Sequence, residues 1–386
     1  MKRPIYLDYN STTPLDPRCL EAMLPFLKDD FGNAANEIHS MGWTAKNAIN
    51  KATAQVGQML NCKPHEIVWN SGATEGNNAV LKFLAQDDLK NNQTPHFITS
   101  AIEHPSVLQT CLDLQSKNKI ELTILSVDSQ GFINLDELKS AIKPQTVLYS
   151  VMWINNEIGT VQNMQKISEI CAEKKIYLHT DATQAVGKIQ IDLAKIRVHF
   201  LTASAHKFYG PKGTGFLYTR SEAPYVPPPK LMSGGPHQNG LRPGTMNTAA
   251  IVATGVACEI IKNELERENA NYKNLIQGFL KDLKSEFPQL VINGPIVGSD
   301  QRSPMNLSLT FPNKPIELAL SKLAGIAFSQ GAACHSGETT MSQTLMAIGL
   351  TEKLAMCTIR LSVGRLTTTA DLKQAADLII RALASN

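Results

Sequence analysis

Lys207 stands in a setting that could support Schiff-base chemistry. It comes shortly after the apolar run 200–202, which predicts a strand, and close to the Ser204 hydroxyl and the His206 imidazole. A lysine amine at a strand end beside such groups can bond to a carbonyl compound. The alternative is a solvated lysine ahead of a β-turn, because most lysines lie at the surface. The glycine-rich run 210–215 lacks the G-x-x-x-x-G-K-[ST] order of a nucleotide phosphate loop.

Asp181 offers a carboxylate after a second expected strand, at 176–179. A carboxylate there can pair with a protonated pyridine nitrogen and keep the ring cationic, which makes the ring an electron sink. An aspartate in this position can equally well cap the first turn of a helix. The local sequence does not decide between the two roles.

Two more clusters suit a phosphorylated aromatic ring. Residues 70–78, which include Ala73 and Thr74, are small enough for backbone N–H groups to close around an anion at a helix start. His104 follows another expected strand, and its imidazole could stack on a ring or carry a proton. An ordinary capped helix and a structural histidine are the simpler alternatives.

Taken together, the four clusters match one cofactor. A Schiff-base lysine, a carboxylate for a pyridine nitrogen, a phosphate cup and a stacking imidazole fit pyridoxal 5′-phosphate. They also fall at the ends of successive expected strands, where open α/β sheets bind their ligands. The sequence therefore predicts a single site for this cofactor.

The elements that must position these residues alternate along the chain. Helices are expected from Glu75 and from Pro105, between short β-branched runs. Strands are expected at 66–69, 96–99, 122–125, 146–151, 176–179 and 200–202. Strands separated by helices favour parallel βαβ units. We predict an α/β protein with a mostly parallel central sheet.

The length of 386 residues favours two domains around one site. A long helical pattern at 249–287 contains the expected domain change near Ala257, and a closing helix is expected at 370–383. The predicted division is a large cofactor-binding domain, 15–256, and a small α+β domain made of 1–14 and 257–386.

Composition excludes several classes of protein. Hydrophobic residues make up 43% and charged residues 18% of the chain, as in an average globular protein. The formal net charge of +3 is too small to indicate a nucleic-acid partner. No stretch is apolar for long enough to predict a membrane span, and Asp8 and Asn10 interrupt any signal core at the N-terminus.

The seven cysteines are odd in number, widely spaced and without a C-x-x-C pair. This spacing favours neither a disulfide framework nor a structural zinc site. We expect a cytoplasmic protein with no metal site, in which most cysteines are core residues.

Motifs along nearly the whole chain resemble the cysteine desulfurase branch of the class V aminotransferases. These motifs are Tyr6–Pro14, Phe31-Gly32-Asn33, Ser71–Glu75, Glu103-His104, Asn155–Gly159, Asp181–Gln184, His206-Lys207 and Arg360–Arg365. The resemblance implies a pyridoxal-phosphate enzyme of fold type I. As a set these motifs are specific to the family.

The resemblance also implies roles at the cofactor. Lys207 would carry the Schiff base, Asp181 would pair with the ring nitrogen, and Gln184 would donate to the ring hydroxyl. His104 would stack on the ring and belong to the catalytic set. The phosphate cup would be formed by Ala73, Thr74, Ser204 and His206.

Three further residues are implied in substrate binding and assembly. Asn156, at the cofactor, and Arg360 would hold the substrate carboxylate, for which an Arg fork is well suited. Thr245 would be a phosphate ligand lent by a second subunit, so the resemblance implies a homodimer with shared sites.

Cys334 matches the cysteine of the family that forms a persulfide. It lies in the small-residue run 330–337, which we expect to be a mobile loop of the small domain. A thiolate is the attacking form, and a neighbouring cation such as His335 would favour it. A small buried cysteine is the alternative.

Some stretches resemble the selenocysteine lyase sub-branch, among them 331–336 and 241–245. The chain also departs from the family: Ala34 follows Asn33 where a proline is usual, and the run 234–239 contains Pro236 and lacks a common arginine. Loop shape and dimer contacts near the site are expected to differ accordingly.

The resemblance thus implies conversion of L-cysteine to L-alanine, with a persulfide on Cys334 for an acceptor protein in iron–sulfur cluster assembly or thiolation. Release of selenide from L-selenocysteine is the nearest alternative. A class V aminotransferase acting on a small amino acid would need no thiol. An inactive scaffold would not need the set Lys207, Asp181, His104, Cys334 and Arg360.

Overall fold

The computed structural model describes residues 3–86, 93–222, 229–335 and 338–384. A seven-stranded sheet forms its centre, in the order β2-β8-β7-β6-β5-β3-β4. The strands are β2 (Ile67–Asn70), β3 (His96–Ser100), β4 (Glu121–Leu125), β5 (Thr146–Ser150), β6 (Tyr177–Asp181), β7 (Phe200–Ser204) and β8 (Gly215–Thr219). Strands β3 to β7 pair in parallel, whereas β8 pairs antiparallel with both β7 and β2.

The six expected strands are therefore present, and the sheet is mostly parallel as predicted. Strand β8 was not expected. It begins at Gly215, the last residue of the glycine-rich run that was rejected as a phosphate loop, and Phe216 and Leu217 carry its apolar signal. Because β8 lies between β2 and β7, strand β2 joins the sheet by antiparallel pairing with β8 rather than through a parallel βαβ unit.

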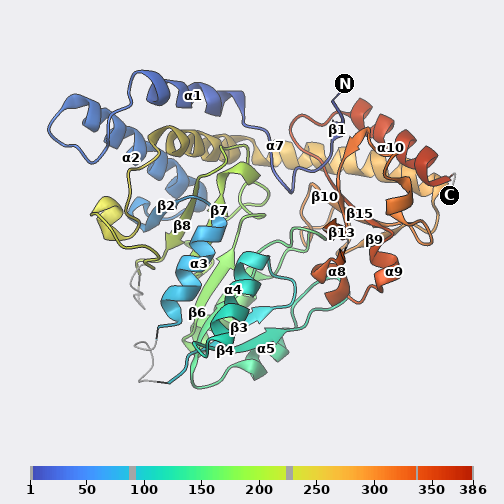
Figure 1. Ribbon diagram of the computed structural model, residues 1–386, viewed down its shortest axis with the longest axis horizontal. Coiled ribbons are helices and arrows are strands. Elements are labelled where there is room, and N and C mark those ends of the chain that lie inside the picture. The colour runs from blue at the N-terminus through green and yellow to red at the C-terminus, as the bar shows by residue number, and fades with distance from the viewer. Residues whose placement is uncertain (1–2, 87–92, 223–228, 336–337, 385–386) are drawn as a thin grey trace.

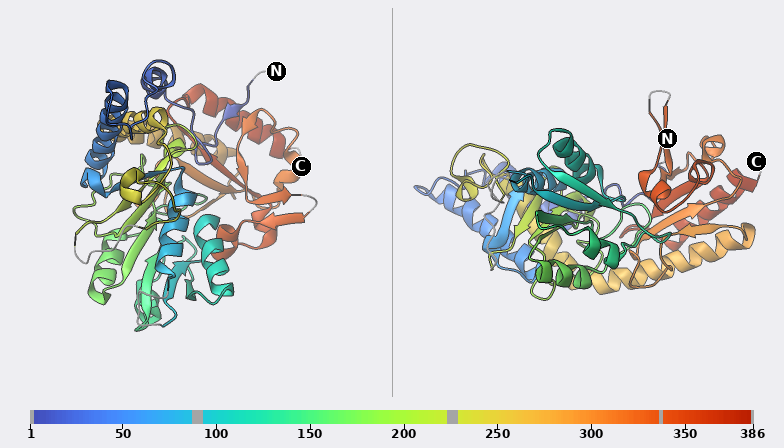
Figure 2. Two further views of the ribbon diagram at one scale, coloured as in Figure 1. Left: turned by 60° about the vertical axis from the view of Figure 1, so that its left-hand side comes forward. Right: turned by 90° about the horizontal axis from the view of Figure 1, so that it is seen from below.

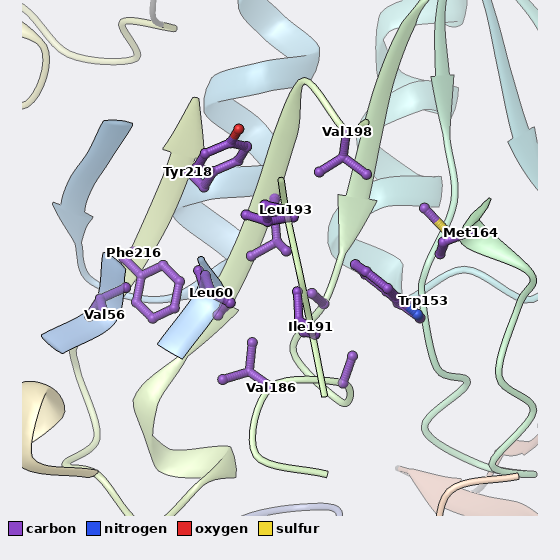
Figure 3. Packing of buried hydrophobic residues seen from close by; sticks show 14 of the residues in the cluster. Val56, Leu60, Trp153, Met164, Val186, Ile191, Leu193, Val198, Phe216 and Tyr218 are labelled. Carbon is purple, nitrogen blue, oxygen red and sulfur yellow. The ribbon is translucent and has the colours of Figure 1, made fainter. Parts of the chain in front are cut away.

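Helices cover both faces of this sheet (Figure 1). Along a strand, neighbouring side chains point to opposite faces. Phe216 accordingly packs with Trp69 in one core, and Leu217 packs with Val68 in another. Figure 3 shows the first of these cores around Phe216 and Tyr218. The helices that enclose the sheet are α2 (Ser40–Leu60), α3 (Ala73–Leu84), α4 (Pro105–Ser116), α5 (Leu135–Ala141) and α6 (Met164–Lys174).

A second, antiparallel sheet has the order β12-β15-β10-β9. Its strands are β9 (Val291–Asn293), β10 (Asn306–Thr310), β12 (Ser329–Gln330) and β15 (Thr358–Ser362). The N-terminal strand β1 (Ile5–Tyr6) pairs with β11 (Ile326–Ala327), so the first residues of the chain return to this half of the molecule. A separate core surrounds this sheet and includes Leu7 and Tyr9.

Helix α7 (Thr248–Glu286) connects the two halves (Figure 2). Its residues 251–261 pack in the core of the large sheet, and residues 272–283 pack in the core of the second sheet. The expected domain change near Ala257 thus lies inside one continuous helix, and the division at 256/257 remains a prediction. The closing helix α10 (Thr369–Ala384) packs against α7 as expected.

The remaining elements are α1 (Pro17–Lys28), α8 (Gln343–Ala347), α9 (Glu352–Ala355), β13 (Ala332–His335) and β14 (Glu338–Met341). Strands β13 and β14 pair only with each other and stand away from the body of the molecule in both views of Figure 2. No helix within the described ranges combines the length and apolar character needed to cross a bilayer.

Candidate active site

A cavity of about 620 Å³ opens at the carboxyl ends of the central strands. Strand β6 ends at Asp181, strand β7 ends at Ser204, and helices α3 and α4 begin beside them. Of the predicted residues, Ala73, Thr74, His104, Asn156, Asp181, Gln184, Ser204, His206, Lys207 and Arg360 line this cavity. The topology therefore brings ten separate sequence predictions to one place.

Lys207 ends a single 3-10 turn, Ala205–Lys207, directly after β7. Its Nζ donates to the backbone oxygens of Asn10, at 2.8 Å, and Ser11, at 2.7 Å. Burial, together with the charge of Arg360, lowers the pKa of Lys207 to about 8. The solvated-lysine alternative is wrong, and the amine has a substantial neutral, nucleophilic fraction near that pH.

Asp181 is buried and its carboxylate is held in place on both oxygens. Oδ1 accepts from the Thr183 backbone N–H at 2.9 Å, and Oδ2 accepts from Asn77 Nδ2 at 2.8 Å. Asn77 in turn accepts from the Thr202 hydroxyl. The bond to Thr183 holds a turn, and no helix begins in residues 182–190, so the helix-capping alternative is wrong and Asp181 lies at the cavity instead.

The predicted phosphate cup surrounds the first turn of α3. Gly72 precedes the helix at φ +143°, and a Cβ there would lie 3.1 Å from Ser204 Oγ. The N–H groups of a helix start favour an anion, and Lys207 and Lys212 add positive charge to the same cavity. This cradle fits a phosphate group.

His206 and His104 are both held at Nδ1 by neighbouring polar groups. His206 Nδ1 lies 3.0 Å from Thr12 Oγ1, and burial together with nearby lysines lowers the His206 pKa to about 4, so the ring is neutral. His104 caps α4: its Nδ1 accepts from the Ser106 backbone N–H at 3.1 Å. That bond fixes the His104 ring at the wall of the cavity.

Arg360 reaches the cavity from β15 of the second sheet. Its Nη2 donates to Asp8 Oδ1 at 2.9 Å and to hydroxyl groups of Ser11 and Ser329, both at 2.7 Å. Its Nη1 donates to the backbone oxygen of Asn156 at 3.1 Å. Nε is buried and has no hydrogen-bond partner among the described residues.

Thr245 does not line this cavity. It lies in a smaller adjoining hollow, of about 90 Å³, that shares Ser71 and Gly213 with the cavity. Within one chain the structure thus does not bring Thr245 to the other predicted cofactor residues. A contribution to the site of a second subunit stays a prediction.

Cys334 lies in β13, with its backbone opposite Thr339 of β14. The run 332–335 was expected to be part of a loop, and this is wrong for the backbone, because antiparallel pairing with β14 makes it a strand. The Cys334 side chain lies outside what the structure describes. Met341, at the end of β14, and Gln330 of β12 border a hollow of about 440 Å³ that Arg360 shares with the main cavity.

Sequence reasoning missed several residues of the site. Asn10, Ser11 and Thr12 line the cavity and bond to Lys207, Arg360 and His206 respectively. They belong to the motif Tyr6–Pro14, which was noticed but given no role. Only the return of the N-terminus beside β11 and β15 reveals it.

Glu103, in the motif Glu103-His104, was likewise given no role. Burial raises the pKa of its carboxyl to about 8, so it is mostly protonated at neutral pH. Its Oε1 accepts from the Ser100 hydroxyl and from the Met152 backbone N–H, 3.0 Å away. Within the described part of the chain, no group of His, Cys, Asp or Glu side chains could hold a metal ion.

Comparison with known proteins identifies the class. The aminotransferase class-V family matches residues 5–375. The chain therefore belongs to the class V aminotransferase family, whose members use pyridoxal phosphate. The cavity fits that group through its buried amine of lowered pKa, its held carboxylate and its helix-start cradle.

The relatives narrow the family further. Cysteine desulfurase IscS of Neisseria gonorrhoeae is 42% identical over 98% of this chain and 92% of its own length. The enzyme of the same name from Rickettsia prowazekii is 40% identical over 97% of this chain and 90% of its own. On this similarity the chain belongs with the cysteine desulfurases.

Solved structures agree with this placement. A NifS-like protein superposes with a TM-score of 0.90 at 32% identity, covering 99% of this chain and all 100% of that one. The structure described as SspA in complex with cysteine has a TM-score of 0.79 at 34% identity, covering 93% and 98%. Both confirm the predicted fold type.

Proposed function

We propose that this protein is a cysteine desulfurase that converts L-cysteine to L-alanine and passes the sulfur to an acceptor protein. The observation that carries the proposal is the meeting of Lys207 and Arg360 in one cavity, from different sheets. One supplies an amine with a pKa of about 8, and the other supplies a fork for a carboxylate. In an α-amino acid, the carboxylate that Arg360 would bind and the proton that Lys207 would accept are both attached to the α-carbon.

The atoms balance with the Cys334 thiol as sulfur acceptor. The Cβ–S bond of the substrate breaks and an S–S bond forms on Cys334, while Cβ gains a hydrogen and leaves as the methyl group of alanine. No outside oxidant is needed, because carbon is reduced as sulfur is oxidised. The outer sulfur of the persulfide then passes to an acceptor for iron–sulfur cluster assembly or thiolation, which breaks the S–S bond and leaves the Cys334 thiol.

Pyridoxal phosphate, when bound, withdraws electrons from the substrate α-carbon and makes its proton acidic. The neutral Lys207 amine accepts that proton at Nζ. Asp181 would stabilise a positive charge at the ring nitrogen of the cofactor, and Asn77 fixes the orientation of the Asp181 carboxylate. Arg360 and Asn156 hold the substrate carboxylate, which fixes the α-proton toward Lys207.

Substituting Arg360→Lys is expected to raise KM for L-cysteine roughly 10- to 100-fold with a smaller change in kcat. A lysine keeps the charge beside Asp8 but cannot bind a carboxylate in a bidentate manner, and a charged hydrogen bond contributes about 1.5–3 kcal/mol. Steady-state alanine formation measures the effect, with Arg267→Lys, whose side chain is 77% exposed, as the matched control. An unchanged KM would remove Arg360 from substrate binding.

The active form is proposed to be a homodimer to which Thr245 contributes across the interface. Apolar side chains that a single chain leaves exposed support this: Phe31, 70% exposed, and Ile38, 89% exposed, lie between α1 and α2, and Trp43, 51% exposed, lies in the first turn of α2. A surface of this kind is typical of a subunit contact. Sedimentation of the purified protein should show a dimer at micromolar concentration, and a monomer with full activity would contradict the shared site.

L-Cysteine is the proposed substrate rather than L-selenocysteine. The relatives described above are named cysteine desulfurases, and none of the described contacts around Arg360 or Lys207 distinguishes sulfur from selenium. The aminotransferase and scaffold alternatives leave Cys334 without a role.

A further inference from the structure

The amide of Gln184 is oriented from both sides. Its Nε2 donates to the backbone oxygen of Asn10 at 2.9 Å, and its Oε1 accepts from Lys188 Nζ. A backbone carbonyl can only accept, so the amide nitrogen must face Asn10. Lys188 can donate whether its amine is charged or neutral. One N–H of Gln184 then remains for an acceptor in the cavity that Gln184 lines.

Gln184 and Lys188 lie one turn apart in the segment 183–188, which follows β6. The segment is held at its backbone, since Lys188 N–H donates to Ala185 at 3.0 Å and the Lys188 oxygen accepts from Asn269 of α7 at 2.8 Å. The residues that follow are anchored in the core by Ile191 and Leu193 (Figure 3). A turn fixed in this way keeps the two side chains on one face.

Lys188 is unusual because it is buried without a carboxylate. It is 1% exposed, and in the described structure its amine has no acidic partner and bonds only to Gln184. Burial, with Lys207 and Arg360 nearby, lowers its pKa well below the ordinary range. Since burying an amine is costly for folding, an apolar side chain would be the simpler occupant of this position.

We propose that Lys188 is a positioning residue that holds the Gln184 amide with its N–H, rather than its oxygen, toward the ring oxygen of pyridoxal phosphate. The inference rests on the proposed function, which gives Gln184 the donor role. Without Lys188, the amide oxygen is left without a partner, and only the bond to Asn10 opposes rotation of the amide. A rotated amide would turn that oxygen into the cavity, where it would face the ring oxygen, acceptor against acceptor.

The test is a pH titration of the visible absorption band of the bound cofactor, from which the midpoint of the spectral change is obtained. The dissociation constant of the cofactor is measured for the same variants. A donor at the ring oxygen favours the deprotonated form, where that oxygen carries more negative charge, so losing the donor raises the midpoint. Lys188→Met should raise it by roughly 0.5–1 pH unit, the equivalent of one neutral hydrogen bond. Lys273→Met, at the exposed rim of the hollow that Lys188 also lines, should leave it unchanged.

A double-mutant cycle separates action through Gln184 from a direct effect of a nearby charge. Gln184→Met alone should shift the midpoint at least as far as Lys188→Met. If Lys188 acts through Gln184, adding Lys188→Met to Gln184→Met produces no further shift. A full additional shift in the double variant would overturn the proposal, as would an unchanged midpoint in Lys188→Met.

If Lys188→Met does not fold, Lys188→Gln is measured in its place. It keeps a donor in the cavity without the charge, so a midpoint close to that of the unaltered protein is expected. A shift as large as in Gln184→Met would overturn the proposal. Failure of the unaltered protein to bind the cofactor would sink the proposed function and this inference together, whereas normal turnover with an unchanged Lys188→Met midpoint sinks only the inference.

Discussion

Lys207→Ala is expected to lower alanine formation from L-cysteine by roughly four orders of magnitude or more, as happens when the central group of a catalytic set is removed. The substitution removes both the amine that bonds to the cofactor and the group that accepts the α-proton. Its Nζ is held by two backbone oxygens and its pKa is lowered to about 8. No other amine in the described cavity has this setting, since Lys212 is exposed.

The control is Lys195→Ala, whose side chain is 81% exposed and which should keep full activity. Borohydride reduction followed by peptide mapping supplies a readout independent of turnover. The unaltered protein should carry the reduced cofactor on the Lys207 peptide, and Lys207→Ala should carry none. Labelling of another lysine at the same yield would contradict the assignment.

Cys334→Ala is expected to lower L-cysteine turnover at least roughly 100-fold, while cofactor binding stays intact. The substitution removes the thiolate that attacks the substrate sulfur, and loss of an attacking group typically costs several orders of magnitude. L-Selenocysteine turnover should fall less, because a selenol is more acidic and leaves more easily. Alanine formation from the two substrates, run in parallel, measures the difference.

Cys62→Ala is the matched control for the thiol. Burial raises the pKa of Cys62 to about 12, so it is not a thiolate at neutral pH. Its loss should leave turnover unchanged. Equal losses on both substrates in Cys334→Ala would count against the idea that selenium release depends less on the thiol, and no loss on either would remove Cys334 from the reaction.

Much of the fold could be predicted because buried parallel strands are recognisable in the sequence as short β-branched runs. Strand β6 and the long helix α7 were expected within one or two residues of their observed bounds. Strand β8 was missed because glycine and proline at 210–215 indicated a turn, and the pairing with β2 that makes it a strand joins residues far apart in sequence.

The residues of the site likewise fall into those that the sequence could predict and those that it could not. Asp181, Lys207 and the start of α3 carry local signals at strand ends, so the sequence could place them together. The N-terminal residues Asn10 and Ser11 carry no such signal, since tertiary pairing beside β11 and β15 brings them to the cavity. The link from Lys188 to Gln184 is likewise invisible in sequence, because a buried lysine looks the same as a solvated one.

The most direct test of the account is to incubate the cofactor-loaded protein with L-cysteine alone and to measure both products in the same sample. Alanine is quantified by chromatography, and the Cys334 peptide is analysed by mass spectrometry without reductant. The account predicts alanine together with one additional sulfur atom on Cys334, the first turnover giving one of each per active site. Alanine with no sulfur on Cys334, or a cofactor-loaded protein that forms no alanine, would contradict it.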